Sequence, residues 1–302
     1  MKNIAEEIQN VQIYPATTRV EPNDKVTKFL FNFSDRAYQK LINGKECAVT
    51  EVRHHKKHGK VTSSFKIQNA DGYTQIIPLD EFDRAVLSVC VSEMEAGNLY
   101  TTPAIIFRGL TGKVGRGDAE PWANQLTDIR QSVDKMMFTA FDPNVTDAFE
   151  KLNYGDGEVK ILKSAILPAC RVEVTINGQK AEVIYFDRES PLMQIAEVKN
   201  QIIRYDASLL DVPNLRNTPR VITLKNYLIR RVMEIKAHGM TPTITFDDLF
   251  EKIRITNRDR EAKVDARNIT KNFFEHLQSK GVIKTFEFVK KGVAIHAVTF
   301  TF

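Results

Sequence analysis

Basic and amide side chains recur at helical spacing towards the C-terminus of the chain. Lys263, Arg267 and Lys271 are four residues apart, and Asn268 directly follows the second of them. Lys and Arg neutralise phosphate groups, whereas Arg and Asn make paired hydrogen bonds with the edges of guanine and adenine. The pattern predicts a helix that contacts double-stranded DNA. The alternative is a charged helix face that contacts only water.

Two further lysines stand in a predicted turn. Lys290 and Lys291 precede Gly292, between the stretches 282–288 and 293–302 that we expect to be strands of a hairpin. A hairpin tip beside a DNA-binding helix meets the phosphate backbone at the edge of the groove. Otherwise these lysines are merely solvated.

A second polar set lies on the predicted helix 120–140, whose buried stripe is expected to be Trp122, Leu126, Ile129, Val133 and Met137. Its outward side chains form hydrogen bonds but carry little positive charge: Asn124, Gln125, Asp128, Gln131 and Lys135. If this helix enters a groove, it reads bases more than it supplies attraction. A dimer interface or plain solvent exposure explains the pattern equally well.

The glycine-rich stretch 109–117 invites a nucleotide-binding interpretation, which its spacing excludes. A Walker A loop requires Lys followed by Ser or Thr, whereas Lys113 is followed by Val114, and the stretch follows a predicted helix rather than a strand. We expect a flexible connection in which Lys113 and Arg116 touch phosphates.

The histidines His54, His55 and His58 stand in a basic turn, 54–60, that has no carboxylate or cysteine. Adjacent histidines in a turn point apart, so the turn is interpreted as a cationic hairpin tip that touches nucleic acid or is solvated. No nucleophile with a recognisable base motif is found either. We therefore expect no catalytic residues, metal or cofactor.

Length and composition indicate an ordinary globular protein. The 302 residues suffice for two domains, and no run of about 18 apolar residues could span a membrane. Residues 1–10 are too polar for a secretory signal. The three cysteines, Cys47, Cys90 and Cys170, are odd in number and far apart, which favours a reduced, cytoplasmic protein.

The positive charge is concentrated at one end of the chain. Residues 220–302 hold 16 Lys and Arg against 9 Asp and Glu, a balance of +7, whereas residues 1–219 have a balance of −2. A chain selected only for solubility has no need of this segregation, which favours an anionic partner for the C-terminal segment.

The elements expected to position these residues form a recognisable order near the C-terminus. After a helix that stops at Gly239, a short strand leads to Thr245, which can cap a second helix; a longer helix ends at Gly281, and a hairpin closes the chain. The expected ranges are 224–238 and 263–280 for the long helices and 241–245 for the strand. The second long helix is expected to place an apolar stripe, Ile269, Phe273 and Leu277, on one face. This is the order of a winged helix-turn-helix, which lays its third helix in a DNA major groove.

The same order is predicted once before, without similarity of sequence. The ranges are helix 80–96, strand 99–101, helix 102–107, helix 120–140 and strands 159–167, 170–176 and 180–186. Residues 190–219 are expected to be irregular, apart from a strand at 201–205, and to contain the domain boundary. Strands and a short helix are expected earlier, at 26–33, 34–41, 46–53, 61–68 and 73–77.

The predicted fold is therefore α+β, with two winged-helix domains in tandem and an N-terminal antiparallel β-rich extension. Its parts are a flexible arm (1–24), a β-rich subdomain (25–78), a first winged-helix domain (79–215) and a second (216–302).

Four stretches extend this pattern: the helix 80–96, the helix 120–140, Ser190-Pro191-Leu192 leading to Ile202-Ile203-Arg204-Tyr205, and Leu224-Lys225-Asn226-Tyr227-Leu228-Ile229-Arg230-Arg231. Over about residues 79–302 the chain resembles the theta-type plasmid replication initiators, as a divergent member. The N-terminal eighty residues and the glycine-rich stretch have no counterpart in that pattern.

The resemblance implies a non-enzymatic protein that binds direct repeats of a replication origin. In that family the first domain often dimerises, the second makes much of the specific contact, and host initiator and helicase are recruited. By position, Lys263, Arg267, Asn268 and Lys271 would lie in the groove, and Asn124, Gln125 and Gln131 would contribute from the first domain. The alternatives are a winged-helix transcription regulator and a protein-interaction adaptor that does not bind DNA.

Overall fold

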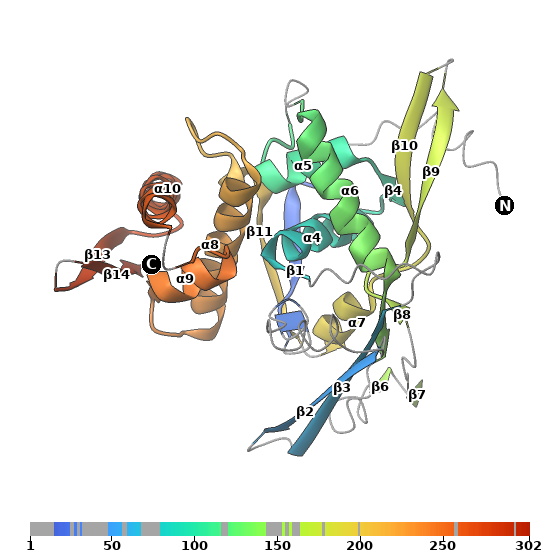
Figure 1. Ribbon diagram of the computed structural model, residues 1–302, viewed down its shortest axis with the longest axis horizontal. Coiled ribbons are helices and arrows are strands. Elements are labelled where there is room, and N and C mark those ends of the chain that lie inside the picture. Colours follow the sequence, from blue (N-terminus) through green and yellow to red (C-terminus); the bar gives the residue numbers. More distant parts are fainter. Residues whose placement is uncertain are drawn as a thin grey trace.

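The structure is a computed structural model that describes residues 15–24, 27–28, 31, 48–55, 59–67, 79–115, 120–142, 153–154, 157–158, 164–176, 179–198, 200–256, 259–292 and 294–302. Helices and small antiparallel sheets are mixed along the chain (Figure 1). The predicted α+β class is confirmed.

The first unit begins at a helix that the sequence caps strongly. Asp80 accepts hydrogen bonds from the backbone N–H groups of Phe82 and Asp83, while the Asp83 side chain accepts from Asp80 N–H. The elements are α4 (Glu81–Glu95), β4 (Tyr100–Thr101), α5 (Pro103–Thr111), α6 (Ala123–Phe138), β9 (Ala169–Ile176) and β10 (Gln179–Phe186). Their strands form an antiparallel sheet in the order β4-β10-β9.

The second unit repeats this order of elements. They are α8 (Pro219–His238), β12 (Thr243–Thr245), α9 (Phe246–Lys252), α10 (Arg260–Ser279), β13 (Thr285–Lys291) and β14 (Ala294–Thr301), with the sheet order β12-β14-β13. Each predicted element is found. Helix α8 begins earlier than the predicted Leu224 because Thr218 caps it and Pro219 suits its first turn.

Aromatic packing fixes α10 against the terminal hairpin. The Phe274 ring lies 5.6 Å from that of Phe286 and 5.4 Å from that of Phe300, measured between centroids. Phe273 and Leu277, two members of the predicted apolar stripe, are fully buried. The outward face of α10 is therefore set by the core behind it.

The predicted flexible arm, 1–24, is wrong for residues 15–24. Thr18–Pro22 form strand β1, which pairs antiparallel with β11 (Ile202–Asp206). Arg19 and Glu21 are buried with Val20, so the polar composition of this segment does not indicate exposure. Residues 1–14 lie outside the described part.

The predicted strand 26–33 is not found where the structure describes the chain. Residues 27–28 are helical, with hydrogen bonds from Lys28 N–H to Asp24 O and from Phe31 N–H to Thr27 O. The predicted helix 34–41 and the strand 73–77 lie outside the described residues.

The predicted hairpin of the N-terminal subdomain is present as β2 (Ala48–His55) and β3 (Gly59–Ile67). Strand β3 also pairs with β5 (Thr139–Asp142), which follows α6, and β5 pairs with β8 (Ser164–Ala165). A small hairpin joins β6 (Asn153–Tyr154) and β7 (Gly157–Glu158). The β-rich extension therefore shares a sheet with residues that follow α6.

The connection between the units is more ordered than expected. It contains helix α7 (Pro191–Val198), strand β11 and a short 3₁₀ helix, η1 (Ala207–Leu210). Its apolar residues Ile203, Tyr205, Leu209, Leu210 and Val212 belong to the same core as α8 and α10. The interpretation of residues 190–219 as largely irregular was wrong, and much of this connection packs with the second unit.

Gly109 and Gly112 are needed for close packing and do not form a flexible connection. Gly112 ends α5 at φ +78°, and a Cβ there would lie 2.4 Å from Asp211 N and 2.6 Å from Ala207 O. A Cβ on Gly109 would lie 2.7 Å from Val89 Cγ1. These glycines let α5 approach α4 and η1.

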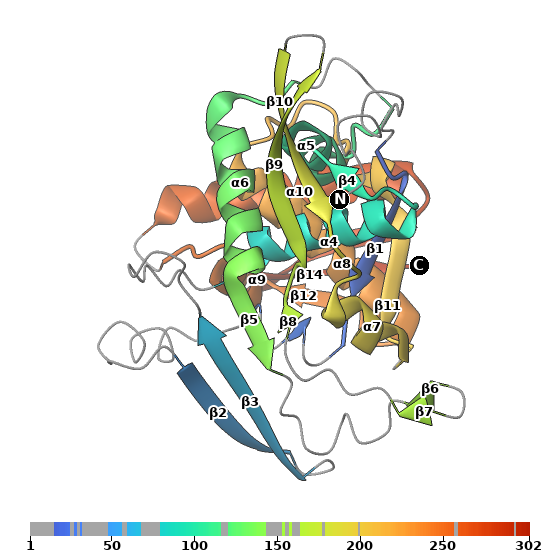
Figure 2. The same ribbon diagram turned by 90° about the vertical axis from the view of Figure 1, so that its right-hand side faces the viewer.

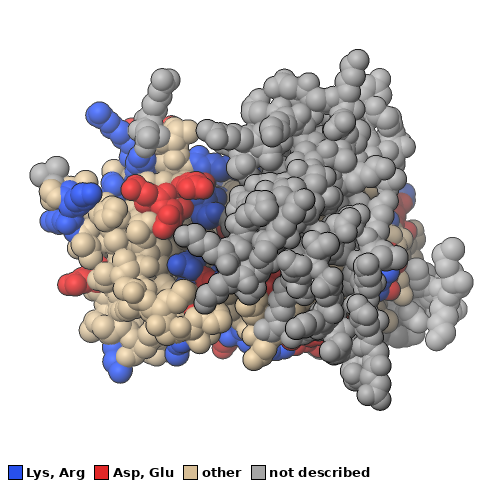
Figure 3. All heavy atoms as spheres, turned by 90° about the horizontal axis from the view of Figure 1, so that it is seen from below, with Lys and Arg blue, Asp and Glu red and all other residues tan. Residues whose placement is uncertain are grey.

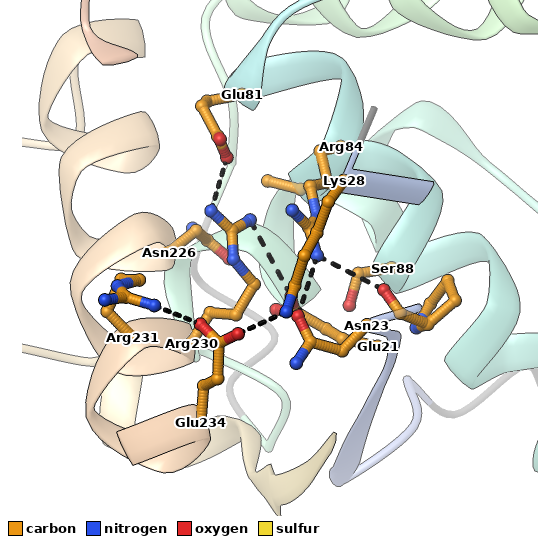
Figure 4. A network of polar contacts seen from close by, with 12 residues as sticks. Glu21, Asn23, Lys28, Glu81, Arg84, Ser88, Asn226, Arg230, Arg231 and Glu234 are labelled. Carbon is orange, nitrogen blue, oxygen red and sulfur yellow. Dashed lines mark hydrogen bonds and ion pairs between the residues drawn. The ribbon is translucent and has the colours of Figure 1, made fainter. Parts of the chain in front are cut away.

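A buried polar network joins the two units where α8 packs on α4 and β1 (Figure 4). The Arg230 guanidinium donates to Glu81 at 2.7 Å and lies 3.9 Å from Glu21, whose other oxygen accepts from the Tyr205 hydroxyl. Arg84 donates to Pro22 O at 3.2 Å. The network therefore ties β1, α4 and α8 together.

The rim of this network gives a prediction about acid stability. Burial by itself opposes ionisation of Glu234, but Lys28 and Arg231 outweigh it and lower the pKa of Glu234 from 4.5 to about 2. The resulting stabilisation is complete above pH 4.5 and disappears as the pH falls towards 2. We expect Glu234→Gln to lower the denaturant midpoint at pH 7 and to differ little from wild type near pH 2. A difference that is independent of pH would contradict the assignment.

Candidate nucleic-acid interface

Helix α10 presents a polar face opposite its buried side. Ala266, Thr270 and Phe273 are buried, which leaves one broad strip of the helix in solvent. Between Arg260 and Glu275 the exposed side chains are Arg260, Glu261, Val264, Asp265, Asn268, Lys271, Asn272 and Glu275. This strip mixes both charges with two amides, so it is less cationic than the sequence pattern predicted.

Lys263 and Arg267 lie at the flank of α10 rather than on its outer face. The Lys263 amine is 5.2 Å from the Phe250 ring centroid, and the Arg267 guanidinium is 5.4 Å from the same ring and 5.6 Å from that of Phe246. Arg267 also donates to Ile295 O at 3.4 Å. Positions eight residues apart on a helix differ by about 80°. The three predicted contact residues therefore do not share one face: Lys263 lies against α9, whereas Lys271 projects into solvent.

Asn268 and Lys271 project from the exposed strip. Lys271 lies 3.7 Å from Glu275, one turn further along, and both side chains are more than half exposed. Such a pair contributes little stability and is easily exchanged for a phosphate contact. These two predicted contact residues are therefore available to a ligand.

The tip of the β13–β14 hairpin is cationic. Lys290 and Lys291 are exposed, a bulge separates Val289 from Lys290, and Gly292 turns the chain at φ +64°. Figure 3 shows blue side chains gathered at this end of the molecule, with a group of carboxylates further in. The hairpin carries its lysines beside α10, where a groove-bound helix would bring phosphates.

The corresponding helix of the first unit, α6, divides its predicted contact residues. Asn124 and Gln131 are exposed. Gln125 is 8% exposed; it accepts from Trp122 N–H at 2.9 Å and donates to Asn217 O at 2.5 Å. Gln125 therefore caps the helix and holds the connection between the units, so it is not carried into the proposed interface.

The start and end of α6 differ from the predicted buried stripe. Trp122 was expected inside, but it is 53% exposed and stacks under the guanidinium of Arg216, 4.5 Å from the ring centroid. Ile129 and Val133 are buried as predicted, and Phe138 at the other end is 52% exposed. Two large aromatic side chains thus flank an otherwise polar face.

The cations around α6 are neutralised by carboxylates (Figure 2 shows α6 beside β9 and β10). Arg130 pairs with Glu182 at 2.5 Å, and Arg171 bridges Glu182 and Asp134. Lys135 pairs with Asp83 at 3.1 Å; burial, and then the neighbouring Asp80, raise the pKa of Asp83 to about 6. This face consequently offers little net attraction to an anion.

Only some of the other predicted contact residues belong to the described part of the chain. Lys113 is half-buried after α5, while Arg116 and the turn residues 56–58 lie outside the described part of the chain. Within the residues described, Cys90 and Cys170 are free, and no group of His, Cys, Asp and Glu is arranged to hold a metal ion. Among the described helices, none combines the length and apolar content needed to cross a bilayer.

No protein-family model matches the chain, and no curated protein matches it at a significant level. Function is therefore inferred from the repeated order of elements and from the chemistry of the exposed faces.

Several exposed residues near α10 were missed from the sequence. Asn272 lies four residues after Asn268, so the same helical spacing would have placed it on the exposed strip. Arg220 stands at the start of α8 and Arg254 in the turn after α9, and only the fold brings both of them beside Asp80. No pattern in the sequence indicates that Arg220 and Arg254 lie close together.

Proposed function

We propose that this chain is a sequence-specific double-stranded DNA-binding protein, acting in the cytoplasm as an initiator of plasmid or mobile-element replication that binds repeated origin sequences. The proposal includes two winged-helix domains in tandem and α10 as the helix that enters the major groove. It assigns no catalytic activity and no cofactor to the chain.

The observation that carries this proposal is the repeated topology. Both units have the order helix, strand, helix, helix, hairpin, and in both sheets the first strand pairs with the last, which in turn pairs with the middle one. A winged helix uses this arrangement to expose its third helix beside a hairpin. The second unit adds an exposed polar strip and a cationic hairpin tip to it.

The chemistry of α10 supports base reading combined with attraction from its surroundings. Asn268 and Asn272 suit adenine edges, while Glu261 and Asp265 suit the amino group of cytosine. Net attraction then comes from Lys271, from the hairpin lysines and from cations at the flank of the helix. This division explains how an almost neutral helix face can belong to a DNA-binding surface.

DNase footprinting on the DNA that neighbours the coding sequence tests the proposal. Protection of direct repeats is expected for an initiator, whereas a single promoter palindrome would indicate a transcription regulator instead. Equal binding to every sequence would overturn specific recognition. Absence of binding at about 0.1 M salt would favour an adaptor that contacts only proteins.

The first unit favours a protein partner over DNA. Its α6 face has paired charges and two exposed aromatic residues, Trp122 and Phe138. Apolar groups flanking a nearly neutral face are typical of protein contacts. We infer that this face serves homodimerisation or the recruitment of host initiator and helicase.

A phosphate contact by Lys271 gives a quantitative prediction. Lys271→Ala should reduce the slope of log affinity against log salt by about one, and it should weaken binding about equally for specific and random duplexes. Lys180→Ala is a suitable control because Lys180 is an exposed, ion-paired lysine on the first unit's hairpin. An unchanged slope for Lys271→Ala would remove this residue from the interface.

A further inference from the structure

A small cleft lies where the first unit meets the second, outside the strip and hairpin described above. It has a volume of about 80 Å³ and is bounded by the start of α4, the first turn of α8 and the end of α9. Asp80, Glu81, Phe82, Arg220, Lys252 and Arg254 contribute to its wall. Three cations therefore converge on a space large enough for a phosphate oxygen and water.

The carboxylates of the cleft are already used by the fold. Glu81 is buried against Arg230 at 2.7 Å. One oxygen of Asp80 caps α4, and the other lies 3.6 Å from the Arg254 guanidinium. Arg220 is exposed, and the Arg254 side chain is 57% exposed. The solvent side of the cleft is consequently cationic.

The cleft continues the cationic flank of α10. Hydrogen bonds from Thr256 lower the pKa of Asp259, and the positive charges of Arg220 and Lys263 lower it further. Both cations must therefore lie near Asp259, which precedes α10. A line of cations thus runs from the flank of α10 to the junction of the units.

We propose that this cleft binds a phosphate of the DNA backbone through Arg220 and Arg254, beyond the groove occupied by α10. The inference rests on the proposed function. It extends the contact from the second unit alone to a site built by both units. A phosphate there would be held by Arg220 and Arg254 and would lie against the start of α4 in the first unit, so the relative position of the units would affect DNA affinity.

Arg220→Ala tests the contact by salt-dependent binding to the protected repeat and to a random duplex of equal length. We expect the slope against log salt to fall by about one for both duplexes. Hydroxyl-radical footprinting should show lost protection at sugars flanking the segment covered by α10. The double variant Arg220→Ala/Arg254→Gln should weaken binding further but still lower the slope by only about one, because both guanidinium groups contact the same phosphate.

Arg204→Ala is the matched control. Arg204 is exposed and pairs with Glu95 at the far end of α4, roughly 20 Å along that helix from the cleft. Its slope should equal that of wild type. An Arg220→Ala slope that also equals wild type, with an unchanged thermal midpoint, would overturn the cleft contact. A reduced slope without preference for the repeat would retain the cleft and overturn sequence-specific recognition.

Discussion

Replacing Arg230 with alanine is expected to lower the free energy of unfolding by about 3–5 kcal/mol. Its guanidinium is 5% exposed and lies between Glu81 and Glu21, which are 3% and 2% exposed. Truncation leaves these carboxylates buried without their main cation. A buried carboxylate without a cation costs far more free energy than the intact ion pair contributes. The loss of stability should therefore exceed that caused by breaking any surface ion pair.

The buried pairing also determines the sign of the ionisation. Burial alone would raise the pKa of Glu81, but the charges of Arg230 and Arg84 outweigh it and lower that pKa. Removing Arg230 takes away the larger of the two opposing charges. Glu81 should then take up a proton at a higher pH than in wild type, so part of the lost stability should return in the double variant Arg230→Ala/Glu81→Gln.

Urea unfolding followed by circular dichroism measures the effect. Arg204→Ala, which breaks an exposed pair, should change the unfolding free energy by less than about 1 kcal/mol. A loss for Arg230→Ala no larger than this control would show that the junction network does not hold the units together. A biphasic transition confined to Arg230→Ala would show that the units unfold separately once the network is broken.

The helices and strands of the second unit could be predicted almost completely because local residues determine where each of them begins and ends. Thr245 caps α9 as expected, Gly239 and Gly281 adopt the positive φ that ends a helix, and the apolar spacing of α10 gives its buried side. Such signals act over a few residues. They need no knowledge of the rest of the chain.

The N-terminal strand could not be predicted for the opposite reason. Arg19, Glu21 and Asn23 resemble solvated residues, yet each is buried against groups that lie more than 60 residues away in the sequence. Gln125 was predicted to be exposed for a similar reason. In the sequence, an amide that caps its own helix and bonds to Asn217, 92 residues away, looks the same as an exposed amide on a polar helix face. Hydrogen bonds between polar groups that are far apart in the sequence produce no periodic pattern in it.

The candidate interface shows both situations within one helix. Four-residue spacing correctly placed Lys271 in solvent, but it could not reveal that Phe246 and Phe250 of α9 would draw Arg267 to the flank. The cleft at Arg220 depends on how two units meet, so it follows from tertiary structure alone. Site residues on one element are predictable, whereas a site assembled from several is not.

The proposed base reading by α10 leads to the second prediction: Asn268→Ala should weaken binding to the protected repeat by about 1–3 kcal/mol, or about 5- to 150-fold. Asn268 is exposed near the middle of the helix. It lies between Arg267, which is half-buried, and Lys271, which is exposed. An amide that pairs with an adenine edge carries no charge, so its removal does not change the number of counterions released on binding. The salt slope and the affinity for a random duplex should remain those of wild type.

The contrast with Lys271→Ala makes this prediction sharp, because the two residues are neighbours on one exposed strip. Lys271→Ala should change the salt slope and spare specificity, whereas Asn268→Ala should do the reverse. Asn124→Ala on α6 is the control for an exposed asparagine outside the proposed groove helix. Titrations of repeat and random duplexes at several salt concentrations separate these effects. Equal losses for Asn268→Ala on both duplexes, or a loss matched by Asn124→Ala, would show that α10 does not read the bases.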